Sequence, residues 1–147
     1  MAFTGNFLCT SFKVELLKGV HNFTNSSGNT FRLALYTNSA SFTAATTAYT
    51  ATNEVAGGST NITAKGNALT NVTPTSSGTT ALVDFSDETF SSVTVSGVRG
   101  AMIHNDSASG DPAVAILDFG ADKAASSGDF TVVFPTADAS NAIIRIA

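Results

Sequence analysis

Residues 80–119, TALVDFSDETFSSVTVSGVRGAMIHNDSASGDPAVAILDF, decide the fold. Valine, isoleucine, threonine and phenylalanine dominate four segments in this stretch, TALVDF, TFSSVTV, VRGAMIH and AVAILDF. These residue types favour strands, and the Gly, Ser, Asn and Asp residues between the segments favour turns. Because no helical pattern separates the segments, the crossovers of a parallel α/β sheet are excluded. The stretch therefore predicts consecutive antiparallel strands.

Similar segments extend the pattern in both directions, with FRLALY at 31–36, a weaker ALTNVTP at 68–74, DFTVVF at 129–134 and AIIRIA at 142–147. About eight strands joined by short polar turns are typical of a mainly β protein, here an antiparallel β-sandwich or jelly roll.

The last predicted strand is apolar on both of its faces. Alternation places Ile144 and Ile146 on one face, which we expect to be core, and Ile143 and Arg145 on the other. Arg145 is expected on a partly wet surface or against a carboxylate. Since burying each isoleucine stabilises by about 1.5–3 kcal/mol, we expect removal of residues 142–147 to unfold the protein.

One segment near the N-terminus has helical spacing. Phe12, Leu16 and Leu17 fall on one face of TSFKVELLKG, and Gly19 is placed to end a helix in the left-handed conformation. We predict a short helix at 10–18. Eight or nine residues are too few for an isolated helix, so this one is expected to pack on the sheets.

Residues 37–65 form the long exception to the strand pattern. They are rich in Ala, Thr, Ser and Asn and contain the aromatic residues Phe42 and Tyr49. A loop of this length is unusual in a compact domain, and we interpret it as a partly ordered loop or arm anchored by those two rings. The whole chain, 1–147, is expected to be a single β domain.

The composition points to a protein that assembles with others. Charged residues make up only 12% of the chain, against about 25% in typical domains, so the surface has little protection against association. The net charge is −4 with no basic stripe, which excludes a nucleic-acid partner. No apolar run approaches the ~20 residues of a membrane span, and no secretory leader is evident, so we expect no membrane association.

Candidate catalytic residues are few. A thiol nucleophile could come only from the single cysteine, Cys9. An imidazole base for it could come only from one of the two histidines, His21 and His104. We interpret Cys9 as a small buried residue, His104 as a turn residue and His21 as a partner of the helix end. The tripeptide at 118–120, DFG, lacks the other motifs of a kinase and is interpreted as a strand end.

The loop 105–112, NDSASGDP, carries several oxygen ligands. It lacks the ligand spacing of a known calcium loop, so a plain hairpin turn is favoured over a weak Ca²⁺ site. We therefore predict no catalytic residues, no cofactor and no metal, and a protein that is not an enzyme.

Most of the chain resembles small virion structural proteins of tailed bacteriophages, especially those of marine phages. The resemblance runs through FLCTSFKVELLKGVHNF at 7–23, FRLALYTNSA at 31–40, GAMIHND at 100–106 and AVAILDFGADKAASSGDFTVVFPTADASNAIIRIA at 113–147. It implies a capsid decoration, or cement, protein that binds and stabilises the lattice of major capsid proteins. The implied location is the capsid surface of the virion, after synthesis in the host cytoplasm.

Two other functions stay open at this point. The runner-up is a phage tail or fibre component that contacts the host surface, and a small enzyme or carbohydrate-binding module is the third. For the decoration protein we expect a homo-oligomer that also contacts the major capsid protein. Aromatic side chains often dominate interface energetics, and the predicted interface residues are Phe3, Phe7, Phe42, Tyr49, Ile143 and Arg145.

Overall fold

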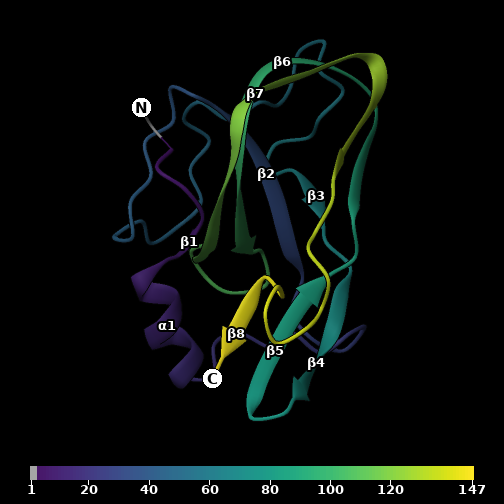
Figure 1. The fold of residues 1–147 in the computed structure, drawn as a ribbon. Coiled ribbons are helices and arrows are strands. Elements are labelled where there is room, and N and C mark those ends of the chain that lie inside the picture. The colour runs from purple at the N-terminus through teal and green to yellow at the C-terminus, as the bar shows by residue number, and fades with distance from the viewer. Residues whose placement is uncertain (1–2) are drawn as a thin grey trace.

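The computed structural model describes residues 3–147, which form two antiparallel sheets and one short helix (Figure 1). This arrangement confirms the mainly β fold with a helix near the N-terminus. The larger sheet has the strand order β1-β7-β6-β2-β3, and the smaller sheet has the order β4-β5-β8. The elements are β1 (Phe7–Leu8), α1 (Thr10–Leu17), β2 (Phe31–Thr37), β3 (Asn67–Ala68), β4 (Asn71–Ser77), β5 (Thr80–Phe85), β6 (Glu88–Asn105), β7 (Ala113–Val132) and β8 (Ile144–Ile146).

Two very long strands, β6 and β7, dominate the larger sheet and bend over the top of the molecule in Figure 1. Each was predicted as two strands separated by a turn. The turns are instead irregularities within continuous strands, because pairing resumes after each register shift. Gly97 and Gly120 have φ values of +65° and +74°, which glycine adopts at little cost.

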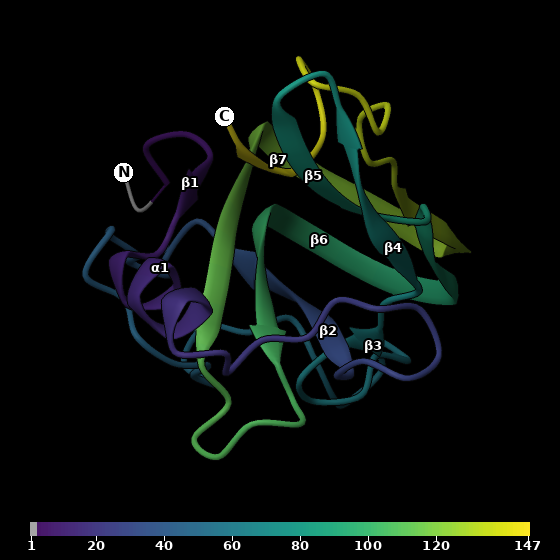
Figure 2. The same cartoon turned by 90° about the horizontal axis from the view of Figure 1, so that it is seen from below.

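The inner face of the larger sheet packs against the smaller sheet. Phe31, Leu33 and Leu35 alternate along β2 toward this side and are fully buried. The Phe31 ring stacks on Phe23 with centroids 4.3 Å apart, and Phe85 of β5 lies 5.9 Å from Phe31. An aromatic cluster therefore joins the two sheets. Figure 2 shows the ribbons of these sheets from below.

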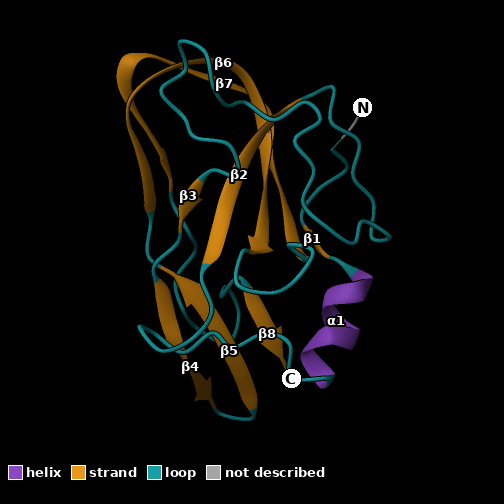
Figure 3. Ribbon diagram, turned by 180° about the vertical axis from the view of Figure 1, so that it is seen from behind, coloured by secondary structure: helices purple, strands orange, loops and turns teal. Residues whose placement is uncertain are grey.

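The outer face of the larger sheet is covered by the segment 38–66 and by residues 3–6, which lie beside β2 and β1 in Figure 3. Tyr36 points to this face and is fully buried. Its ring lies 4.8 Å from Phe42, whose ring lies 5.7 Å from Phe3. The long loop is thus ordered over the sheet, and both faces of the sheet are buried around β2.

The helix α1 ends as predicted but does not bury the predicted face. Gly19 has φ +72°, and the amides of Gly19 and Val20 donate to the carbonyls of Leu16 and Glu15 in a Schellman motif. However, Leu17 is 91% exposed, and Phe12 is the buried residue of the helix. The helix has only eight residues, so it is held to the sheets mainly through Phe12 in its first turn.

The strand β8 is shorter and more exposed than predicted. Ile144 is buried, but Ile146 is 56% exposed, so the expectation that both are core is wrong for Ile146. The strand pairs with β5, placing Arg145 opposite Leu82. It is the last strand in the sheet order, and Ile146, opposite Ala81 of β5, faces an open recess that leaves its side chain exposed.

Deleting residues 142–147 is therefore expected to weaken the protein. The deletion removes buried Ile144 and Ala142 and uncovers Leu82, which should lower the free energy of unfolding by about 2–4 kcal/mol. Thermal unfolding followed by circular dichroism measures the change. Ile146→Ala is the control and should leave the melting temperature almost unchanged; an unchanged melting temperature in the deletion would contradict the role of β8.

Candidate interface cleft

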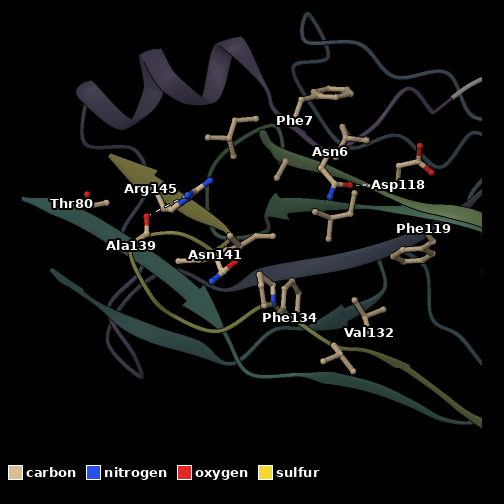
Figure 4. A pocket seen from close by; sticks show the side chains of 18 of the residues that line it. Asn6, Phe7, Thr80, Asp118, Phe119, Val132, Phe134, Ala139, Asn141 and Arg145 are labelled. Atoms are coloured by element: carbon tan, nitrogen blue, oxygen red, sulfur yellow. Dashed lines mark hydrogen bonds between the residues drawn. The ribbon is translucent and has the colours of Figure 1, made fainter. Parts of the chain in front are cut away.

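A cleft of about 720 Å³ opens where the larger and smaller sheets meet at one edge (Figure 4). We call it the edge cleft. One wall is β1 with the adjoining residues 115–119 of β7, and the other is formed by residues 132–135, the connection 139–143 and β8. Both β1 and β8 are the outermost strands of their sheets.

Most of the residues that line the edge cleft have apolar side chains. Phe7 and Leu8 come from β1, Phe119 from β7, and Phe134 and Ile143 from the connection that leads to β8. Apart from buried Phe134, these side chains are only partly buried. The adjacent Val133 is 72% exposed. Such an apolar recess at the surface is a feature that a binding partner would cover.

The negative charge in the edge cleft is compensated within the chain. The Asp118 carboxylate accepts hydrogen bonds from the amides of Gly5, at 3.1 Å, and Gly120, at 2.8 Å, and lies 3.4 Å from Nε of Arg99. Its own amide donates to Oδ1 of Asn6 at 2.7 Å (Figure 4). Asp118 thus ties the N-terminal residues to β7, and the predicted strand end at 118–120 lies inside β7.

The positive charge in the edge cleft belongs to Arg145. Its side chain is exposed and donates from Nη1 to the carbonyls of Ala139, at 3.3 Å, and Ser140 (Figure 4). These acceptors are neutral carbonyls, whereas a carboxylate was one of the two expected environments. Hydrogen bonds from Asn141 and the Ser140 amide hold the pKa of nearby Asp138 below its usual value, with a further contribution from Arg145.

A second recess lies on the other side of β8. It measures about 320 Å³ and is lined by Leu16 of α1, by Leu82 of β5, and by Ile144 and Ile146 of β8. We call it the apolar groove. The odd-numbered side chains of β8 therefore line the edge cleft, and the even-numbered ones line the apolar groove.

The structure brings together half of the predicted interface residues. Phe7, Ile143 and Arg145 all line the edge cleft. Phe3 and Phe42 do not reach the surface: they are 1% and 5% exposed and pack against each other over the outer face of the larger sheet. In the single chain these rings are not available to a partner, because they pack the segment 38–66 and Phe3 onto the sheet.

The sixth predicted interface residue, Tyr49, is also engaged within the chain. Its hydroxyl donates to Glu54, and its ring lies 4.8 Å from that of His104. Burial is the main cause that raises the pKa of Tyr49 to about 12. Tyr49 is half-buried and anchors the long loop.

The two histidines and the cysteine lie in different places. His104 belongs to β6 and is fully buried, so its assignment to a turn is wrong; burial lowers its pKa. Nε2 of His21 donates to the Glu15 carboxylate of α1 at 2.9 Å, and Nδ1 accepts from the side-chain amide of Asn105 at 3.0 Å, so His21 pins the helix to β6. Cys9 is fully buried, and burial, followed by Glu15, raises its pKa to about 11.

The loop that follows β6 is a tight connection between β6 and β7 held by ion pairs. Nζ of Lys65 lies 2.9 Å from both Asp106 and Asp111, and Nε of Arg32 lies 2.7 Å from Asp106. A ring nitrogen of His104 lies within 4.8 Å of both carboxylates, a spacing that metal sites also use. Here the Lys65 ammonium bridges the carboxylates and supplies their positive charge.

These ion pairs predict acid sensitivity. Hydrogen bonds from Arg32 and then Lys65 lower the pKa of Asp106 to about 2. Because the folded pKa lies below the unfolded value of 3.8, the stabilisation is complete above that value and is lost as pH falls toward 2. We expect about 1–2 kcal/mol of unfolding free energy to disappear over this window.

Urea unfolding between pH 6 and pH 2.5 measures this loss. Asp106→Asn should lower stability at pH 6 and flatten the pH dependence. Asp122→Asn, a change at a 54% exposed carboxylate, is the matched control and should retain the wild-type profile. Identical profiles for the wild type and Asp106→Asn would contradict the assignment.

Comparisons with known proteins leave the resemblance to phage proteins untested: no family model, no curated protein and no solved structure matches this chain. Within residues 3–147, no helix is long and apolar enough to cross a membrane.

Proposed function

We propose that this protein is a phage capsid decoration protein, which binds and stabilises the lattice of major capsid proteins without catalysis. The observation that carries the proposal is the surface around β8. Two recesses, the edge cleft and the apolar groove, flank this strand, and most of the residues that line them have apolar side chains. A protein whose task is binding needs a surface of this kind.

Exposed apolar side chains add to this surface. Ile146, which lines the apolar groove, is 56% exposed, and Val133, which lines the edge cleft, is 72% exposed. Leu17, which follows the groove residue Leu16 in the chain, is 91% exposed. Burying large apolar side chains of this kind stabilises by about 1.5–3 kcal/mol each. With a chain that is only 12% charged, the region around β8 is the best candidate for contact with a capsid lattice or with another subunit.

The first test is the position of the protein on virions. Electron microscopy of particles that carry a gold-labelled copy should show label over the head. Label on the tail or fibres would contradict the proposal and favour the tail component. Particles lacking the protein should also lose their DNA at a lower temperature, since a ligand that binds only the intact lattice stabilises it by mass action.

Variants connect the test to the surface. Leu17→Ser and Val133→Ser change exposed side chains, so the fold should tolerate them while particle binding weakens. Thr131→Ser, at an exposed position of β7 beside the cleft, is the control. Full binding by both apolar variants would exclude the surface around β8 as the capsid contact.

A further inference from the structure

The smaller sheet ends at an open edge. It has three strands against five in the larger sheet, and its last strand, β8, pairs only with β5 in the chain that the structure describes. The free edge of β8 borders the edge cleft, and the opposite wall contains β1, which is also a terminal strand. Terminal strands present backbone N–H and C=O groups that another strand can pair with.

The surroundings of β8 suit a fourth strand. In an antiparallel pair, residues directly opposite each other point to the same face. A segment paired with β8 would therefore direct alternate side chains toward the edge cleft, beside Ile143 and Arg145, and toward the apolar groove, beside Ile144 and Ile146. The apolar groove suits small or medium apolar side chains, and the edge cleft, which also holds Asp118 and Arg145, accepts both apolar and polar ones.

The charges in the edge cleft favour an acidic segment. Asp118 already receives two amide hydrogen bonds and lies 3.4 Å from Arg99. Arg145 is exposed and donates to two carbonyl oxygens, and Asp138 is the nearby carboxylate whose pKa it lowers without forming an ion pair. A carboxylate from a partner would therefore find a cation at the edge where its backbone pairs.

A second copy of this chain suits the edge less well. An isologous pairing of two β8 strands centred on Arg145 would place the two guanidinium groups directly opposite each other, which is unfavourable. The open edge of β7 carries Lys123 and several register shifts, features that protect an edge from pairing. The occupant is thus expected to be a different chain.

We propose that the free edge of β8 is an acceptor site for an extended segment of a partner protein, with alternating apolar side chains and a carboxylate opposite Arg145. The partner segment adds to the smaller sheet as a fourth strand. This inference deepens the proposed function, since it names the contact through which a decoration protein of this fold would hold its neighbour.

The test uses a blocked synthetic peptide, Thr-Val-Asp-Val-Thr-Val, titrated into the full chain labelled with ¹⁵N. We expect amide shifts at residues 143–146 and at Phe7 and Leu8. Two further peptides carry N-methyl groups on alternate sets of amides. Because a strand pairs through one set, one of these peptides should lose binding and the other should retain it.

A charge exchange tests the role of Arg145. Replacing Asp by Lys in the peptide should weaken binding about fivefold, the equivalent of about 1 kcal/mol. Arg145→Glu should reverse this preference. Lys123→Glu, an exposed cation of β7 outside the cleft, is the matched control and should keep the preference for Asp.

Three results would overturn the inference: no shifts at residues 143–146, equal binding of both N-methylated peptides, or peptide-free shifts at β8 that grow with protein concentration and so indicate a second copy. Its failure is distinguishable from failure of the proposed function. Full binding of the Arg145→Glu variant to capsids would refute strand addition at β8 but leave the capsid function standing. Binding of the peptide by a protein that does not bind capsids would refute the capsid function but leave the acceptor site standing.

Discussion

Gly66→Ala is expected to lower the free energy of unfolding by about 3–5 kcal/mol. Gly66 has φ +72°, and a Cβ built on it would lie 1.8 Å from the carbonyl oxygen of Leu33 and 2.8 Å from Cα of Ala34. Both atoms belong to the backbone of β2, which pairs with β6 on one side and β3 on the other, so neither can move aside without breaking pairing. Since whole domains are stable by about 5–15 kcal/mol, the variant should be largely destabilised or insoluble.

Gly57→Ala separates the two causes of this effect. Gly57 has the same φ, +72°, and lies in the same loop, but a Cβ there would meet nothing within 4 Å. It should therefore lose only the conformational part, about 1–2 kcal/mol. Urea unfolding with a common slope compares the two variants. Equal losses would mean that the close approach of Gly66 to β2 does not exist in solution.

Phe31→Ala should cost about 3–5 kcal/mol, the range for truncating a buried phenylalanine. The side chain is fully buried between the sheets, stacked on Phe23 and close to Phe85. The cavity would lie where the smaller sheet meets the larger one, so the contact between layers is expected to fail first. Val133→Ala, at a 72% exposed residue, is the control and should change stability by less than about 0.5 kcal/mol.

A double-mutant cycle tests the stacked pair directly. Combining Phe31→Leu with Phe23→Leu should reveal a coupling energy of about 0.5–1.5 kcal/mol between the rings. The leucine variants keep most of the buried volume, so they are expected to remain folded. Additive losses would show that the stacking contributes nothing beyond burial.

The strand segments were predictable because their alternation survives in the structure. The segment TALVDF became β5 without a change of bounds, and Gly19 ended the helix in the predicted left-handed conformation. The continuity of β6 and β7 was not predictable. Ser96 and Gly97 have the composition of a turn, and local sequence does not distinguish a turn from a bulge between strands that continue to pair.

The edge cleft was predictable only in part. The apolar character of Ile143 at the end of the chain and of Phe7 before the helix indicated surfaces that need cover. Leu117 and Phe134, which also line the cleft, gave no such signal, because their position depends on the path of β7 and its connection to β8. Phe3 and Phe42 were predicted to contact a partner because aromatic residues in loops often do so. In the structure both rings are buried against the chain's own larger sheet.

The pairing of β1 with β7 has a consequence for the order of folding. Phe7 lies opposite Ile116, and the Gly5 amide donates to a carboxylate 113 residues later in the chain. During synthesis, residues 5–8 therefore stay unpaired until residues 115–118 of β7 have left the ribosome. Long-range pairings of this kind slow folding, because a large loop closes before the contact is gained. The β6–β7 hairpin, whose strands are joined by a short turn, is expected to form early and to serve as the template on which the N-terminal residues dock last.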